Sequence, residues 1–173
     1  MTVKSLKATE YLDYFSHFLN LVPQNESIVE SLELVFKNNL EFFLSIPVAK
    51  HEYRYKNGKW TIKELLSHLI DTERIFNYRA LRIARNDKTP MEGFNENDYA
   101  VHSFANSRSM ESLIEEYKAV KLATIALFNN FSPEVLRQVG VASGHNVSVR
   151  AIGFIISGHE IHHVNVIKER YLE

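Results

Sequence analysis

The chain has 173 residues, of which 45% are hydrophobic, so we expect a single domain over residues 1–173 with a sizeable core. Its net charge is −1 and its basic residues form no stripe, which argues against a nucleic-acid partner. The sequence contains no cysteine, which excludes disulfides, thiolate metal sites and a cysteine nucleophile. The N-terminus does not resemble a signal peptide and no apolar run is long enough to span a bilayer, so we expect a cytoplasmic protein without a membrane partner.

Residues 1–25 contain many apolar side chains between Tyr11 and Leu21. They could form a short helix that ends near Pro23, or an arm packed on the rest of the molecule. The first long helix is predicted over residues 28–44, because Ser27 and Glu30 have the spacing of a capping box and apolar residues follow at helical intervals. Residues 46–59 are predicted to be a connection.

The second helix is predicted over residues 62–84, after a second capping box at Thr61. His68 lies on the flank of its apolar stripe, with Thr72 and Arg79 on the same ridge. Glu73 falls inside the stripe and therefore needs a partner. The arginines of this helix are expected to be solvated or paired rather than to bind phosphate.

Residues 86–108 are rich in polar residues and are predicted to be a long loop that crosses an end of the bundle. A third helix is predicted over residues 110–130, where Lys121 and Thr124 could line a pocket or belong to a solvated flank. A short helix over 133–136 and a loop over 140–146 lead to the last helix, over 149–171. The pattern predicts an all-α bundle.

The last helix carries the strongest chemical signal. His159 and His163 are one turn apart on the face that also contains Ile152, Ile155 and Ile156, where an imidazole needs partners for both ring nitrogens. A metal ion is one such partner, and two buried histidines without a metal are the simpler alternative. His162 lies at the edge of this face, and the remaining histidines other than His68 are expected at the surface or in loops.

The segment also matches the H-E-x-x-H pattern of zinc peptidases. The longer peptidase pattern requires a further glycine and histidine, but the corresponding residues are Val166 and Glu169, so we disfavour this interpretation. A third ligand is better sought upstream, and His68 is the best candidate because it lies in a strongly helical segment. Three histidines with an open fourth position are typical of catalytic zinc.

Three segments together resemble the DinB-like superfamily, specifically its YfiT-like branch of metal-dependent hydrolases. They are GKWTIKELLSHLIDTERIFNYRALRIARND, TPMEGFNENDY and SVRAIGFIISGHEIHHVNVIKERYL, and the resemblance covers about residues 28–172. It implies a four-helix bundle with up-down-down-up topology and a long crossover between helices two and three. It also implies one zinc or nickel ion held by His68, His159 and His163, and a homodimer.

The resemblance implies a hydrolase that acts on a small molecule with metal-activated water. Glu160 is then a possible general base, or a group that supports a ligand. Two alternatives remain open at this stage: an S-transferase that uses a low-molecular-weight thiol at the same metal, and a non-catalytic metal-binding stress protein.

Overall fold

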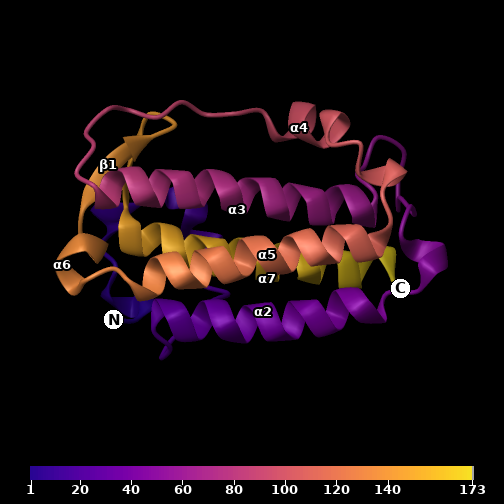
Figure 1. Ribbon diagram of the computed structural model, residues 1–173, viewed down its shortest axis with the longest axis horizontal. Coiled ribbons are helices and arrows are strands. Elements are labelled where there is room, and N and C mark those ends of the chain that lie inside the picture. Colours follow the sequence, from indigo (N-terminus) through magenta and orange to yellow (C-terminus); the bar gives the residue numbers. More distant parts are fainter. Residues whose placement is uncertain (173) are drawn as a thin grey trace.

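Four long helices lie side by side in the computed structural model, which describes residues 1–172 (Figure 1). They are α2 (Ile28–Ser45), α3 (Ile62–Ala84), α5 (Met110–Asn129) and α7 (Val149–Tyr171). Helix α3 packs against α5 and α7, and α2 packs against the same two helices. Figure 1 shows α2 and α7 running in one direction and α3 and α5 in the other. The predicted four-helix bundle with up-down-down-up topology is therefore confirmed.

The long helices begin where the sequence places their capping residues. The hydroxyl oxygens of Ser27 and Thr61 accept hydrogen bonds from the backbone N–H three residues later, and both capping boxes are complete. Ser109 and Ser148 cap α5 and α7 in the same way. The short α6 (Pro133–Leu136) follows Ser132, as predicted, and a 3₁₀ turn, Val48–Lys50, lies between α2 and α3.

The crossover from α3 to α5 returns the chain along the whole length of the bundle, at the top of Figure 1. This return is what allows α3 and α5 to run in the same direction. The sequence predicted a loop here, but the segment also contains α4 (Glu96–His102) and a 3₁₀ turn, Ala105–Ser107. Asn95 caps α4 by accepting a hydrogen bond from the N–H of Asn97.

The predicted loop over residues 140–146 is wrong, because this segment forms a β-hairpin. Strands β1 (Val139–Ala142) and β2 (His145–Ser148) pair antiparallel, with Ala142 opposite His145. The two turn residues, Ser143 and Gly144, both have positive φ, as a tight hairpin turn of this length requires. Met91 of the crossover pairs with β1 on its other side, so the hairpin and the crossover are joined by backbone hydrogen bonds.

The N-terminal segment consists of three 3₁₀ turns, Val3–Ser5, Ala8–Glu10 and Asp13–Phe15, followed by the short helix α1 (Ser16–Leu19). A buried ion pair joins Glu10 to Arg150 at the start of α7, and Ser148 also donates to Glu10. Helix α1 packs on α7, where a side chain at Gly158 would collide with the carbonyl oxygen of Phe18. This glycine therefore permits the close approach of the two segments.

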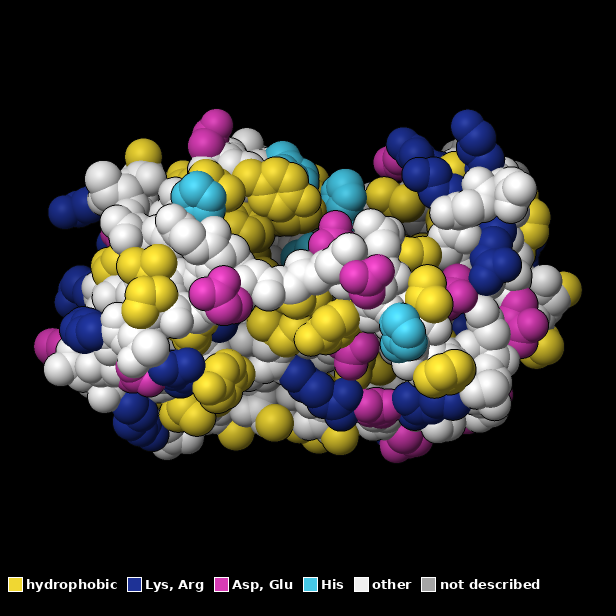
Figure 2. Space-filling view, turned by 90° about the horizontal axis from the view of Figure 1, so that it is seen from above, with side chains coloured by type: hydrophobic (Ala, Val, Ile, Leu, Met, Phe, Trp, Pro, Cys, Tyr) yellow, Lys and Arg dark blue, Asp and Glu magenta, His cyan; other side chains and the backbone are white. Residues whose placement is uncertain are grey.

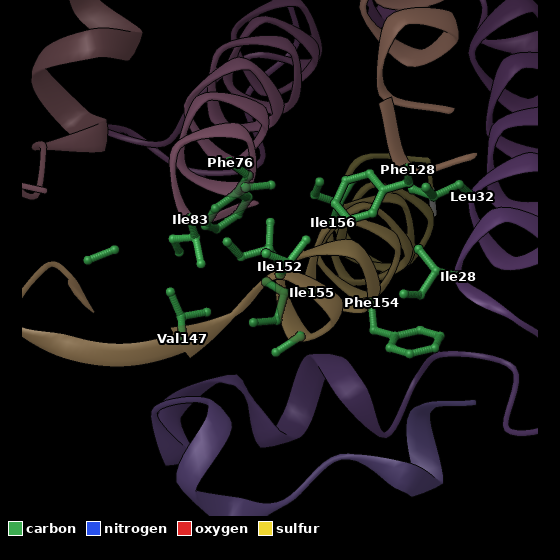
Figure 3. Packing of buried hydrophobic residues seen from close by; sticks show 14 of the residues in the cluster. Ile28, Leu32, Phe76, Ile83, Phe128, Val147, Ile152, Phe154, Ile155 and Ile156 are labelled. Carbon is green, nitrogen blue, oxygen red and sulfur yellow. The ribbon is translucent and has the colours of Figure 1, made fainter. Parts of the chain in front are cut away.

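The buried hydrophobic residues form two clusters. One lies near the start of α7, and Figure 3 shows Phe76 and Ile83 near Ile152, with Phe128 beside Ile156. The other lies near the end of α7, around Leu66, Leu113 and Ile167. Among residues 1–172, no helix has the length and apolar character needed to cross a membrane.

Candidate metal centre

Three histidine rings meet between α3 and α7. The Nε2 atom of His159 lies 3.2 Å from the Nε2 of His68 and 3.1 Å from the Nε2 of His163. Each of the three residues presents a ring nitrogen within 4.8 Å of those of the other two. His159 and His163 face the same side because they are one helical turn apart, and α3 supplies His68 because it packs directly on α7. The structure thus brings together the three histidines that the sequence singled out.

These histidines are neutral at physiological pH. Burial lowers the pKa of His68 to about 4 and that of His163 to about 3. Burial, together with the neighbouring imidazoles, holds the pKa of His159 well below its ordinary range. Neutral imidazoles are the form that binds a metal ion.

The convergence of three neutral imidazoles fits a cation between them. A neutral ring carries one N–H and one in-plane lone pair, so the Nε2 of His159 cannot form good hydrogen bonds with both of its neighbours. Three nitrogens bound to one tetrahedral zinc ion are ~3.3 Å apart, close to the separations seen here. In addition, the Nδ1 of His68 lies 3.4 Å from the Oγ1 of Thr72. A hydrogen bond donated by this nitrogen leaves the Nε2 lone pair free for the ion.

A cavity of about 290 Å³ opens beside the three histidines. Figure 2 shows histidine and hydrophobic side chains around a hollow in this face of the molecule. Trp60 lines the cavity, with its ring centroid 4.8 Å from that of His68. His17 and His162 also line it, and their ring centroids are 5.5 Å apart. The sequence predicted His17 at the surface or in a loop, and only the packing of α1 on α7 shows that it belongs to this cavity.

Glu160, the residue after His159, points away from this cavity into the bundle interior. Its Oε2 accepts hydrogen bonds from Asn39 of α2, at 3.2 Å, and from the hydroxyl of Tyr117 of α5, at 3.0 Å. The ammonium of Lys121 lies 2.7 Å from Glu160 Oε1 and 2.7 Å from Glu73 Oε2. These residues form a buried polar network to which all four long helices contribute.

This network contains two carboxyl groups, those of Glu73 and Glu160, and one ammonium, that of Lys121. Burial raises the pKa of Glu73 to about 7, against the opposing effect of Lys121. Burial acts to lower the pKa of Lys121, but Glu160 and Glu73 outweigh this effect, so the pKa lies above its ordinary value. The sequence expectation that Glu73 needs a partner is met by Lys121 and by Thr124, which donates to Glu73 Oε1. Lys121 and Thr124 are both fully buried, so a solvated flank is excluded for them.

A family model described as the DinB superfamily matches residues 31–167, which is most of the chain. The chain belongs to the DinB superfamily. No curated protein gives a significant match to the sequence.

Two solved structures show the same DinB-like fold at low sequence identity. One is YfiT from Bacillus subtilis, described as a probable metal-dependent hydrolase with an unusual four-helix bundle topology. It is 12% identical, with a TM-score of 0.69 over 95% of this chain and 90% of that chain. The other is a mycothiol-dependent maleylpyruvate isomerase, 13% identical, with a TM-score of 0.66 over 99% of this chain. The present chain spans 63% of that isomerase.

One arginine of α3, Arg79, differs from the sequence expectation that the arginines of this helix are solvated or paired. Arg74 and Arg82 of α3 are paired with acidic residues, as expected. Arg79 is neither exposed at the surface nor paired: it is 7% exposed and no carboxylate among residues 1–172 forms an ion pair with it. It lines the same cavity as the three histidines.

Proposed function

We propose that this protein is a metal-dependent hydrolase of a small molecule, with one divalent zinc or nickel ion held by His68, His159 and His163. The observation that carries the proposal is the convergence of three neutral Nε2 atoms beside an open cavity. An ion bound by three imidazoles retains a free coordination position, where it can acidify water and polarise a substrate carbonyl.

The chain's own residues would hold the ligands and shape the space in front of them. Phe18 packs edge-on against the His159 ring, and Trp60 lies beside His68. These aromatic contacts fix the orientation of the imidazoles and limit the access of bulk water to them. Thr72 would keep the Nε2 lone pair of His68 directed at the ion.

We assign Glu160 a supporting role in this proposal rather than that of a general base. Its carboxylate contacts Asn39, Tyr117 and Lys121 in the interior, and it lines no part of the 290 Å³ cavity. Through these contacts it would fix the turn of α7 that carries His159.

A second candidate is thiol transfer at the same ion, and the similarity in fold to a mycothiol-dependent isomerase is the reason to test it. Because the sequence contains no cysteine, any thiol must enter as a cosubstrate. The open cavity beside the histidines has room for a small cosubstrate next to the ion.

A cytoplasmic location and a homodimer remain predictions.

The first experiment is metal stoichiometry by plasma mass spectrometry on protein without a tag. Wild type is expected to hold about one equivalent of metal, because three ligands converge on one point. His68→Ala, His159→Ala and His163→Ala are each expected to lose most of it. His102→Ala is the matched control, since this exposed histidine bonds, within residues 1–172, only the carbonyl of Asp98. Wild type that stays metal-free after reconstitution would contradict the proposal.

The second experiment separates the two reactions. Zinc-loaded and nickel-loaded proteins are assayed with small esters, amides and electrophiles, in buffer alone and with an added low-molecular-weight thiol. Hydrolysis predicts turnover in buffer alone that is lost in His163→Ala. Turnover that requires the thiol, and yields a product carrying it, would replace the hydrolase with the S-transferase.

A further inference from the structure

Arg79 occupies the same ridge of α3 as His68 and Thr72, three helical turns farther along. Eleven residues rotate by nearly whole turns, so Arg79 lies only ~20° from His68 around the axis and ~16 Å along it. Both residues line the same cavity. One helix thus presents a candidate metal ligand at one end of the cavity and a guanidinium at the other.

The guanidinium is held in place by neutral groups only. Its Nη2 donates to the carbonyl of Glu92 in the crossover, at 2.8 Å, and to the hydroxyl of Ser143 in the hairpin turn, at 2.9 Å. These two bonds use the hydrogens of one nitrogen, and the other N–H groups have no acceptor within residues 1–172. Burial alone lowers the pKa of Arg79, and no neighbouring acid opposes this shift.

Burying a guanidinium without a nearby anion costs folding free energy. Such a group is therefore usually paired with an acid or positioned to bind a ligand anion. The other charged residue of the cavity wall is Glu96, which forms no ion pair with Arg79 within residues 1–172. The cavity wall also carries the aromatic side chains of Phe15, Phe76 and Phe94, and Thr72 is a polar residue on the ridge between His68 and Arg79. The cavity therefore suits an elongated ligand with an apolar body and an anion at the end opposite the histidines.

We propose that Arg79 is the substrate-binding residue for a carboxylate, and that the substrate is an apolar acid whose reacting group lies at the opposite end, beside the histidines. The inference deepens the proposed function, on which it rests for the position of the reacting group. A carboxylate fits better than a phosphate because one guanidinium in an apolar wall matches a single negative charge. The free N–H groups of Arg79 would donate to its two oxygens.

The test uses straight-chain hydroxamates that bind the ion at one end and differ at the other. A series of increasing length is made with a terminal carboxylate, carboxamide, phosphonate or methyl group. Binding to zinc-loaded protein is measured by calorimetry. The fluorescence of Trp60, the single tryptophan of the chain, reports whether the probe enters the cavity.

At the best chain length, we expect the carboxylate probe to bind wild type about tenfold or more tightly than its carboxamide counterpart. Arg79→Gln is expected to abolish this preference without weakening the methyl probe. Arg79→Lys, which keeps the charge, is expected to retain part of it. Arg82→Gln is the matched control on the same helix, because Arg82 pairs with Asp87 and does not line the cavity.

The carboxylate–carboxamide comparison in wild type needs no variant to fold, and equal affinities there would overturn the inference. Tighter binding of the phosphonate than of the carboxylate would also overturn it. In both cases methyl probes that still bind would leave the metal site standing. If no hydroxamate binds, the proposed function fails, and octanoate is then compared with octanamide on the same protein. Equal binding of those two would overturn the role of Arg79 independently.

Discussion

At the scale of single residues, Glu73 is a carboxyl group whose protonation depends on the fold. Its pKa is raised by burial from an ordinary value of 4.5 to about 7. Between these values the folded protein keeps a proton that the unfolded chain has released, so this group's contribution to stability is complete below about pH 4.5 and is lost as the pH rises through 7.

Glu73→Gln replaces the protonated carboxyl group with a neutral group of similar shape. We expect the variant to be about as stable as wild type at pH 5. It should gain on wild type as the pH rises to 8, by an amount on the order of 3 kcal/mol. Urea unfolding followed by circular dichroism at several pH values measures the difference.

The control is Glu115→Gln, on the exposed side of α5, which should show no such trend. Because only the difference between variant and wild type is used, the titration of other groups cancels. A difference in unfolding free energy that stays constant from pH 5 to pH 8 would mean that Glu73 is ionised in the folded protein throughout.

At the scale of elements, the docking of α1 on α7 connects the N-terminal segment to the candidate site. A Cβ atom at Gly158 would lie 2.2 Å from the carbonyl oxygen of Phe18, and the Phe18 ring packs on His159. Gly158→Ala must therefore displace the backbone of α1. We expect a loss of about 1–3 kcal/mol in unfolding free energy, together with weaker zinc binding.

Gly153→Ala is the matched comparison on the same helix. There the new Cβ atom would meet the side-chain atoms of Ile28 and Phe128, which can shift, and alanine favours the helix over glycine. We expect a smaller change in unfolding free energy and unchanged zinc affinity. Equal effects of the two substitutions on zinc affinity would show that α1 does not support the site. Urea titration and a competitive zinc indicator provide both measurements.

The same scale shows how far the sequence could predict the fold. The long helices were predictable because capping boxes at Ser27 and Thr61 coincide with apolar residues at helical spacing. The β-hairpin was missed because its strands are four residues long, too short for a clear alternation of polar and apolar residues. Its turn, Ser143-Gly144, was the signal that could have indicated it.

The candidate site was predictable to a similar extent. The turn spacing of His159 and His163 on an apolar face marked them without any structure. The isolation of Arg79 could not be read from the sequence, since it depends on the hairpin turn and the crossover meeting beside α3. The burial of Lys121 could not be predicted from the sequence either. A lysine beside an apolar stripe can bury its whole side chain or extend its ammonium to solvent, and the helical spacing does not distinguish the two.

At the scale of the whole molecule, two clusters of buried hydrophobic residues join the four long helices. We therefore expect the metal-free protein to stay folded. Removal of the ion by a chelator should lower the melting temperature, since an ion that binds only the folded state adds about 3 kcal/mol at a hundredfold excess over its Kd, or roughly 5–10 °C. Far-UV circular dichroism during chelation and reconstitution measures both effects.

Loss of helical structure on chelation would instead favour a structural ion, as in the non-catalytic alternative. Chelation of His163→Ala provides the control, because a variant without the full ligand set should show no shift in melting temperature. A shift of equal size in this variant would mean that the chelator acts elsewhere than at the three histidines.

The crossover that returns the chain to the start of α5 also helps to position Arg79, whereas the long helices position the three histidines. The three histidines stand on long helices that the bundle cannot easily reshape, whereas Arg79 is held by Glu92 and Ser143 in short connecting segments. Changes of length or sequence in those segments would redirect the guanidinium while the imidazoles stay in place. On the proposal that Arg79 binds the carboxylate of the substrate, we expect such a bundle to exchange one acid for another during evolution while the three histidines stay unchanged.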